Sequence, residues 1–303
     1  MNATWVFGWA ALGLFTAFSL LFVVERLRKD ASHVDVAWSG AIGVLALFYA
    51  WATPGDLARR AWVSGMAALW AFRLAGYLLK NRVIGKSEDG RYRALREKWG
   101  EQNSLQFFVV FQLQAALALL FSLPIWVAIA NSGQSIRVFE LLAAGVTLVS
   151  VAGESLADAQ LAAFRARPDT RGKTCRTGLW RYSRHPNYFF EWLGWWAWVL
   201  CAVGSPYFAL SLLGPALMLL FLFKVTGIPA TEAQALRSRG ADYAEYQGST
   251  SVFVPWFVRG ANAAKLQLAA TGWGATFSRA ARCRPLITCC TSRAGGSSSA
   301  AGR

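Results

Sequence analysis

The chain has 303 residues, of which 55% are hydrophobic and 14% aromatic, and its formal net charge is +15. Soluble domains average roughly 45–50% apolar residues. Because the excess is gathered here into long runs, the composition excludes an ordinary soluble domain and indicates an integral membrane protein. The positive charge lies in a few loops and is explained by membrane orientation, so nucleic-acid binding is not expected.

Runs long enough to cross a bilayer as helices, about 20 apolar residues each, recur along the chain. They predict an all-α, polytopic membrane helix bundle with about seven transmembrane helices. The last two runs are short and share the corner Gly204-Ser205-Pro206, which predicts a tight hairpin. The predicted spans are Trp5–Val24, Val34–Ala52, Ala61–Leu79, Phe107–Ala130, Val138–Ala157, Tyr188–Gly204 and Tyr207–Phe223.

The distribution of Lys and Arg predicts the orientation of this bundle. With the N-terminus outside, the inner loops and the C-terminal part contain 27 of the 31 Lys and Arg residues, whereas the outer loops contain only Arg59, Arg60 and Arg137. Cytoplasmic loops carry the excess of positive charge, so the topology is predicted as N-out and C-in. The host membrane, a bacterial inner membrane or an endoplasmic reticulum, stays open.

The domain organisation is simple. One transmembrane domain is predicted over residues 1–260, and residues 261–303 are rich in Ala, Ser, Gly and Arg, as is typical of a disordered tail. The chain has five cysteines and two histidines without the spacing of metal ligands, so no metal site is predicted. The segment DYAEYQGSTSVFVPW follows the last span but ends in apolar residues. It is expected either to fold back as a lid or to act as an interfacial anchor.

Ionisable residues within or beside the spans gather in the cytoplasmic half. Such groups are costly in a bilayer and mark functional sites, so their clustering predicts a polar cavity open to the cytoplasm. The structural alternative is that each carboxylate only neutralises a neighbouring arginine. Glu140 lies apart, at the outer rim. The clustered residues are Asp35, Arg73, Glu154, Asp158 and Glu191.

Helical spacing places several of these groups together. Glu154, Asp158, Leu161 and Arg165 step by four, three and four residues, so they share one helix face. The following loop, residues 165–184, contains seven Lys and Arg residues. The guanidinium group of arginine can donate two parallel hydrogen bonds to phosphate oxygens. The loop is therefore expected to bind a phosphorylated cofactor or, alternatively, lipid headgroups.

The run GLWRYSRHPNYFFEW, residues 178–192, is the densest collection of polar groups at the rim of a span. His185 precedes Pro186, which suits the first position of a helix. Asn187 and Glu191 are one helical turn apart. A ligand or partner is expected to satisfy these groups. The polar residues of the run are Arg181, Arg184, His185, Asn187, Tyr188 and Glu191.

This run and its surroundings, GESLADAQLAAFRARPDTRGKTCRTGLWRYSRHPNYFFEWLGWW, resemble the steroid 5-alpha reductase superfamily and, within it, the bacterial-type uncharacterised branch. The pieces VDVAWSG, LWAFRLAGYL, KVTGIPATE and YAEYQGSTSVFVPW extend the resemblance over about residues 35–256 in the family's order. The resemblance implies a membrane oxidoreductase that uses NADPH to reduce a carbon–carbon double bond conjugated to a carbonyl in a steroid-like or other lipid substrate. It also implies a cofactor-binding core at about residues 138–257.

Carried over by position, the resemblance assigns roles to individual residues. Asp35 aligns with the catalytic carboxylate of the steroid enzymes. Trp70, three residues before Arg73, aligns with their catalytic tyrosine. An indole cannot donate an acidic proton as a phenol can, and Tyr77 is the next phenol along the predicted helix. The implied cofactor-binding residues are Glu154, Asp158, Arg165, Lys173, Arg184, His185, Asn187, Tyr188, Glu191 and Tyr246.

Two other functions remain open from the sequence. Membrane isoprenylcysteine and phospholipid methyltransferases also carry an RHP-x-Y motif and a late acidic residue, so Arg184 to Tyr188 with Glu232 could bind S-adenosylmethionine. Asn187, Glu191 and the face from Glu154 to Arg165 favour the reductase. A non-catalytic lipid-binding membrane protein is the second alternative. The expected partners are a lipid-soluble substrate and membrane lipids, and the oligomeric state stays open.

Overall fold

A computed structural model of the chain describes residues 2–100, 103–132, 138–225 and 227–258. Within these ranges the chain is helical, and its only β-type pairing is an isolated bridge between Ser183 and Ser251. The predicted all-α polytopic bundle is therefore confirmed. The long helices are α1 (Ala3–Arg28), α2 (His33–Ala52), α3 (Leu57–Leu78), α5 (Ser104–Ala130), α6 (Val138–Ala166) and α7 (Pro186–Cys201).

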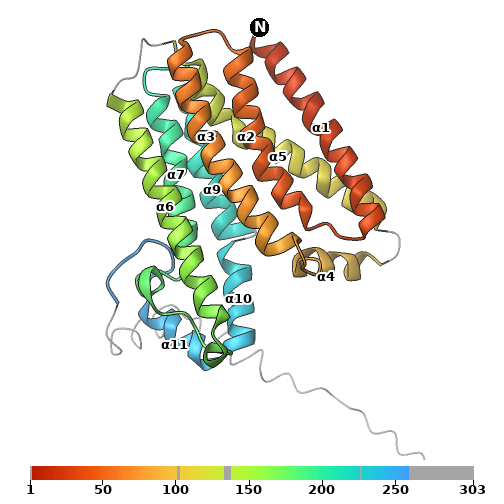
Figure 1. Ribbon diagram of the computed structural model, residues 1–303, viewed down its shortest axis with the longest axis vertical. Helices are drawn as coiled ribbons and strands as arrows, with labels where there is room; N and C mark the ends of the chain where they lie inside the picture. The colour runs from red at the N-terminus through yellow and green to blue at the C-terminus, as the bar shows by residue number, and fades with distance from the viewer. Residues whose placement is uncertain (1, 101–102, 133–137, 226, 259–303) are drawn as a thin grey trace, which may run out of the picture. The chain divides into compact units, whose positions relative to one another are not determined.

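Shorter helical pieces connect and cap these helices. Their order along the chain is shown in Figure 1. They are η1 (Leu79–Val83), α4 (Gly90–Trp99), η2 (Pro168–Thr170), η3 (Gly178–Arg181), α8 (Phe208–Ser211), α9 (Leu213–Leu220), η4 (Phe221–Val225), α10 (Ile228–Arg239) and α11 (Ala241–Ser249).

Six segments of the described chain are long and apolar enough to cross a bilayer, namely α1, α2, α3 with η1, α5, α6 and the region Phe208–Arg239. The sequence predicts about seven spans because it also counts the residues of α7. With 16 residues, α7 is about 24 Å long, which is shorter than the roughly 30 Å of a hydrocarbon core. The predicted corner after α7 is present, with Gly204 at a φ of 85°.

Small residues allow neighbouring helices to approach closely. A Cβ atom at Gly43 of α2 would lie 2.8 Å from the Cβ of Ala71 on α3. A Cβ at Gly153 of α6 would overlap the ring of Phe190 on α7. These two helix pairs, α2 with α3 and α6 with α7, lie side by side along their lengths (Figure 1). Close packing by small residues is typical of helices in membranes, where apolar burial against lipid gives little driving force.

An aromatic cluster joins the pairs at the centre. The indole of Trp195 on α7 is 1% exposed and packs edge-on against Trp70 of α3 and Phe121 of α5, with ring centroids 5.4 and 5.1 Å apart. Phe121 in turn contacts Trp38 of α2. These rings fix the positions of α3 and α7, the two helices that supply the indoles of the candidate site described below.

Two segments close the end of the bundle at which α1 and α3 finish. α4 docks there through Arg96, which pairs with Glu25 and Glu88 at 2.8 Å each. The segment after α11 folds back along the loop before α7, where Arg184 N donates to Ser251 O at 2.8 Å. Folding back of this segment is therefore confirmed. Residues up to Val258 form one compact unit, and the predicted tail, residues 261–303, lies outside the described residues.

Candidate functional site

A buried cluster of charged side chains lies between α3, α6 and α7. Arg73 of α3 pairs with Glu154 of α6 and lies 3.9 Å from Asp158, one turn further along. Asn187, in the first turn of α7, donates to Asp158 Oδ1 at 3.2 Å. Both carboxylates are only 5% exposed. The structure therefore brings together four of the predicted site residues, and it confirms the shared face of Glu154 and Asp158.

Two indoles extend this cluster deeper into the bundle. Trp70 Nε1 donates to Glu191 Oε2 at 2.9 Å, and Trp195 Nε1 donates to Glu191 Oε1 at 3.1 Å. Trp70 thus belongs to the same cluster as Arg73, in agreement with the sequence, and its N–H orients a carboxyl group.

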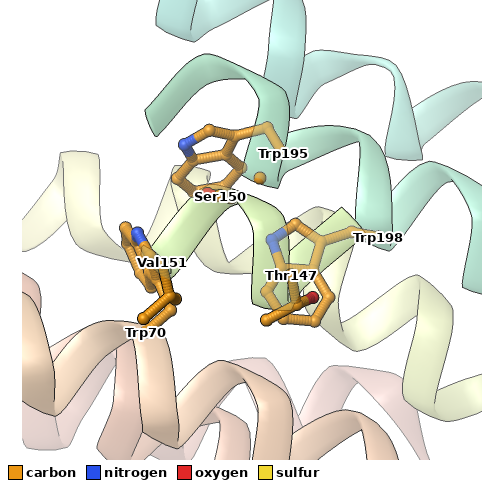
Figure 2. A pocket seen from close by; sticks show the side chains of 7 residues that line it. Trp70, Thr147, Ser150, Val151, Trp195 and Trp198 are labelled. Atoms are coloured by element: carbon orange, nitrogen blue, oxygen red, sulfur yellow. The ribbon is translucent and has the colours of Figure 1, made fainter. Parts of the chain in front are cut away.

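A cavity of about 10 Å³ adjoins the two indoles. Figure 2 shows the rings of Trp70, Trp195 and Trp198 around it, together with the hydroxyl of Thr147. This volume is at the lower limit for one water molecule. The pocket is thus too small for a lipid substrate or a nucleotide, and it marks the inner limit of the polar cluster.

Asp35 lies in a separate group at the start of α2. Its carboxylate accepts the hydroxyl of Tyr92 at 2.7 Å and pairs with Arg91, both from α4, and Arg82 Nη1 lies 3.5 Å away. Burial and the Asp35 charge raise the pKa of Tyr92 above its ordinary value. Asp35 and Arg73, which the sequence predicts to act together, therefore have different polar partners among the described residues.

A basic cleft of about 200 Å³ opens beside the end of α6. Leu161 and Phe164, about one and two turns beyond Asp158, supply apolar lining. Four cations line it, and none of them forms an ion pair within the part of the chain that the structure describes. Arg165 and Lys173 are predicted cofactor contacts, Arg171 belongs to the loop that was expected to bind phosphate, and only Arg239 was not predicted. The four are Arg165, Arg171, Lys173 and Arg239.

Arg184 and His185 lie in a third group, directly before α7, whose N-cap residue is His185. Arg184 Nε pairs with Glu232 of α10 at 2.7 Å, and His185 Nε2 is 3.2 Å from the same oxygen. The His185 ring stacks on Tyr188, with centroids 5.3 Å apart. Gln247 donates to the second Glu232 oxygen at 2.9 Å. These groups satisfy one another, so their visible role is to fasten α10 and α11 to α7.

Tyr246 of α11 is buried beneath the basic loop. Its hydroxyl donates to the backbone carbonyl of Trp180 and also lies 3.1 Å from that of Ser183. Burial, followed by the nearby Tyr243 and Cys175, raises the pKa of the Tyr246 phenol. The structure therefore places Tyr246 in contact with the loop for which the sequence predicts cofactor binding, and its hydroxyl holds the backbone of that loop.

Some site residues could not be singled out from the sequence because their contacts are long-range. Tyr92 is the only buried residue of α4, yet 57 residues separate it from Asp35. Arg239 ends α10, whereas Arg165 lies near the end of α6, and α7, α8 and α9 lie between them in the sequence. Trp195 is different, because its four-residue spacing from Glu191 on one helix was a usable signal.

Comparison with known proteins gives a family assignment. Residues 21–250 match the family described as "Protein of unknown function (DUF1295)", which covers most of the described chain. No curated protein and no solved structure matches the chain. The match spans α2 to α11 and so includes the buried cluster, the basic cleft and the Arg184–Glu232 group. The chain therefore belongs to the DUF1295 family.

Proposed function

We propose that this protein is an NADPH-dependent membrane reductase of a carbon–carbon double bond conjugated to a carbonyl. The observation that carries the proposal is the basic cleft, whose four cations are free of ion pairs within the described residues. Phosphate oxygens are the natural partners of such a cleft, because guanidinium groups bind them with paired hydrogen bonds. The resemblance to the steroid 5-alpha reductase superfamily supports the same cofactor.

The polar atoms left over in the buried cluster fit a ligand of this kind. Asn187 Oδ1 and Arg73 Nε are buried and have no hydrogen-bond partner among the described residues. Such orphaned atoms cost free energy unless a ligand or water satisfies them. Their α6 partners, Asp158 and Glu154, lie about two and three helical turns before Arg165 of the cleft, and Glu154 and Arg165 are about 16 Å apart along the helix. A dinucleotide would fit this arrangement, because its phosphates would bind the cations of the cleft and its amide group would bind the unsatisfied atoms of the buried cluster.

The roles of the chain's residues follow from these positions. Arg165 and Lys173, with Arg171 and Arg239, would bind the phosphates, and Asn187 with Asp158 would orient the polar end of the cofactor. Bound NADPH would supply a hydride to the β-carbon of the substrate. Arg73 would stabilise the negative charge that develops as the carbonyl is polarised.

The setting within the bundle indicates the class of substrate. The cluster lies between helices that are long and apolar enough to cross a bilayer. A lipid-soluble enone, steroid-like or of another kind, would reach it sideways from the membrane, while NADPH would enter from the cytoplasm. The cytoplasmic placement of the cleft rests on the excess of Lys and Arg on that side of the bundle. The membrane is that of a bacterial cell or the endoplasmic reticulum.

A methyltransferase remains the runner-up because the structure brings Glu232 to Arg184 and His185. In that function these residues would contact S-adenosylmethionine. They are paired with one another, however, whereas the cleft cations are free of such pairs within the described chain. The cleft therefore favours a cofactor with several phosphate charges.

The test is a titration of detergent-purified protein with NADPH, NADH and S-adenosylmethionine, followed by thermal unfolding. NADPH is expected to raise Tm in a saturable way, since a ligand that binds only the folded state stabilises it by mass action. Lys173→Ala and Arg165→Ala are each expected to weaken the NADPH effect about tenfold, as for the loss of roughly 1.4 kcal/mol of charge-assisted hydrogen bonding.

Lys86→Ala is the matched control, because Lys86 is an exposed lysine of the α3–α4 connection, outside the cleft. It should leave the NADPH response unchanged. Stabilisation by S-adenosylmethionine alone would assign the protein to the methyltransferases. A lack of response to all three compounds would contradict cofactor binding and favour a non-catalytic lipid-binding protein.

A further inference from the structure

The basic cleft beside the end of α6 contains more positive charge than the diphosphate bridge of a dinucleotide can neutralise. Its four cations come from three segments, and none of the described residues that line it is acidic. The diphosphate bridge carries about two negative charges, whereas a phosphate monoester adds about 1.5–2 more at neutral pH. Four cations therefore match a ligand that carries a diphosphate and a monoester. The cations are Arg165 of α6, Arg171 and Lys173 of the following loop, and Arg239 of α10.

Arg239 is held in place by an aromatic ring. Its guanidinium carbon lies 5.3 Å from the centroid of the ring of Tyr243, on α11. Tyr243 is itself 4% exposed and packs edge-on against Tyr246, with ring centroids 5.8 Å apart. A contact with an aromatic ring stabilises a guanidinium group without occupying its N–H donors, which a carboxylate would occupy. Arg239 is therefore positioned while its donors stay available for a phosphate.

The acidic residue nearest to Arg239 along the chain, Asp242, is engaged elsewhere. Asp242 Oδ2 accepts the backbone N–H of Thr174 at 2.7 Å, and Asp242 Oδ1 pairs with Arg176 at 3.0 Å. These contacts fasten the loop that supplies two of the cleft cations to α11. Asp242 thus holds the loop in place, and the charge of Arg239 is left for a ligand.

The cleft can hold one end of a dinucleotide but not all of it. Its volume is about 200 Å³, whereas sites that bury a whole drug-sized ligand measure about 300–1,000 Å³. Leu161 and Phe164 provide apolar surface for a purine ring beside the cations. The buried cluster, where the amide end of the cofactor would bind, lies about two to three turns earlier along α6. The cleft therefore suits the adenosine end, which carries the 2′-phosphate of NADPH.

We propose that Arg239 binds the 2′-phosphate of NADPH, the group that NADH lacks, and thereby selects NADPH over NADH. This inference rests on the proposed cofactor-binding function. A phosphate monoester presents three acceptor oxygens, which suit the paired N–H donors of a guanidinium group. With NADH in the cleft, the Arg239 charge would be partly desolvated without gaining an anion. The three other cations, on α6 and its loop, remain for the diphosphate bridge.

The test is a calorimetric titration of the detergent-purified full chain at neutral pH. NADPH and NADH differ by the 2′-phosphate, and so do two smaller probes, adenosine 2′,5′-bisphosphate and adenosine 5′-monophosphate. The wild type should bind the member of each pair that carries the 2′-phosphate at least about tenfold more tightly. Arg239→Gln should weaken the binding of NADPH and of the bisphosphate about tenfold, as for the loss of charge-assisted hydrogen bonds, and should leave NADH and the monophosphate unchanged.

Arg237→Gln is the matched control, because Arg237 lies exposed on the same helix, donates to Gln234 at 2.8 Å and is outside the cleft. It should keep the full preference for NADPH. Equal affinity of the wild type for NADPH and NADH, or an Arg239→Gln variant that keeps the wild-type ratio of the two affinities, would overturn the role of Arg239 and leave the proposed function intact. Binding of neither cofactor by the wild type would instead refute the proposed function and this inference with it.

Discussion

The indole of Trp70 donates its N–H to the carboxyl group of Glu191 across 2.9 Å, and this bond joins α3 to α7 between residues 121 positions apart. Trp70 is 4% exposed, and its ring also packs edge-on against Trp195, the second donor to the same carboxyl group. Glu191 is thus fixed from two helices. An aromatic residue that the resemblance aligns with a phenol acts here as a hydrogen-bond donor to an acid.

Trp70→Phe tests the value of that bond. Phenylalanine preserves most of the aromatic packing but removes the N–H, which leaves a buried carboxyl oxygen unsatisfied and should cost about 1–3 kcal/mol. Trp126→Phe is the matched control, because Trp126 is also buried, at 8% exposed, yet its Nε1 has no partner among the described residues. Chemical denaturation in detergent should show a clearly larger loss for Trp70→Phe. Equal losses would mean that only ring volume matters at Trp70.

Hydropathy predicted which segments form membrane helices, but it did not predict where those helices end, because the ends also depend on helix propensity. The predicted span from Val138 ended at Ala157, where polar residues begin, but α6 continues to Ala166. Hydropathy identifies only the part of a helix that lies within the bilayer. The helix itself can continue wherever the residues have high helix propensity, and residues 157–166 are rich in alanine. Helical spacing, in contrast, predicted the continuation, because Glu154 and Arg165 were expected on one helix face, and α6 carries both.

The candidate site was predictable where contacts follow helical spacing. Glu154 and Asp158 share a face through a four-residue step, and Arg73 was identified as a buried charge. The division into separate groups was not predictable, since it depends on which helices pack together. Asp35 is bound by Tyr92 and Arg91 only because α4 folds under the bundle, and no local pattern encodes that docking.

Gly153 allows α6 and α7 to approach closely, so Gly153→Ala should destabilise the bundle. The added methyl group would overlap the Phe190 ring, and overpacking of this kind costs about 1–3 kcal/mol. Gly145→Ala lies on the same helix with no atom within 4 Å of the added carbon. That variant should be neutral or more stable by about 0.5–1 kcal/mol, because alanine favours a helix over glycine. Opposite signs of the two changes in Tm are the expected result.

Arg59 and Glu140 form an ion pair at the end of the bundle opposite α4, at 2.7 Å and almost fully buried. Arg59 also donates to the backbone of Asn131, so the pair links α3, α6 and the end of α5. Arg59→Met should cost about 3–5 kcal/mol, because it leaves the Glu140 charge buried without its guanidinium. The double variant Arg59→Met with Glu140→Met should recover most of that loss. A double variant as unstable as the single one would show that the charges are not coupled.

The docking of α4 should weaken at acidic pH through Asp89. Burial alone would raise the pKa of Asp89, but hydrogen bonds from Arg91 and the charges of Arg91 and Arg82 lower it below the usual 3.8. A carboxylate with a lowered pKa stabilises the folded state fully above its ordinary pKa, and this stabilisation is lost as the pH falls through the lowered value.

Asp89→Asn isolates this effect because the amide oxygen can still accept the Arg91 backbone N–H that caps α4, while the charge is removed. At neutral pH the variant should unfold about 2 °C below the wild type, as for a partly exposed ion pair worth under 1 kcal/mol. The difference should begin to shrink as the pH falls below about 4 and should vanish once the pH lies below the lowered pKa of Asp89, since protonated Asp89 and asparagine are both neutral. Asp169→Asn, on an exposed pair with Arg167, should give a much smaller difference. A difference at Asp89 that is independent of pH would show that the side chain acts through the cap alone.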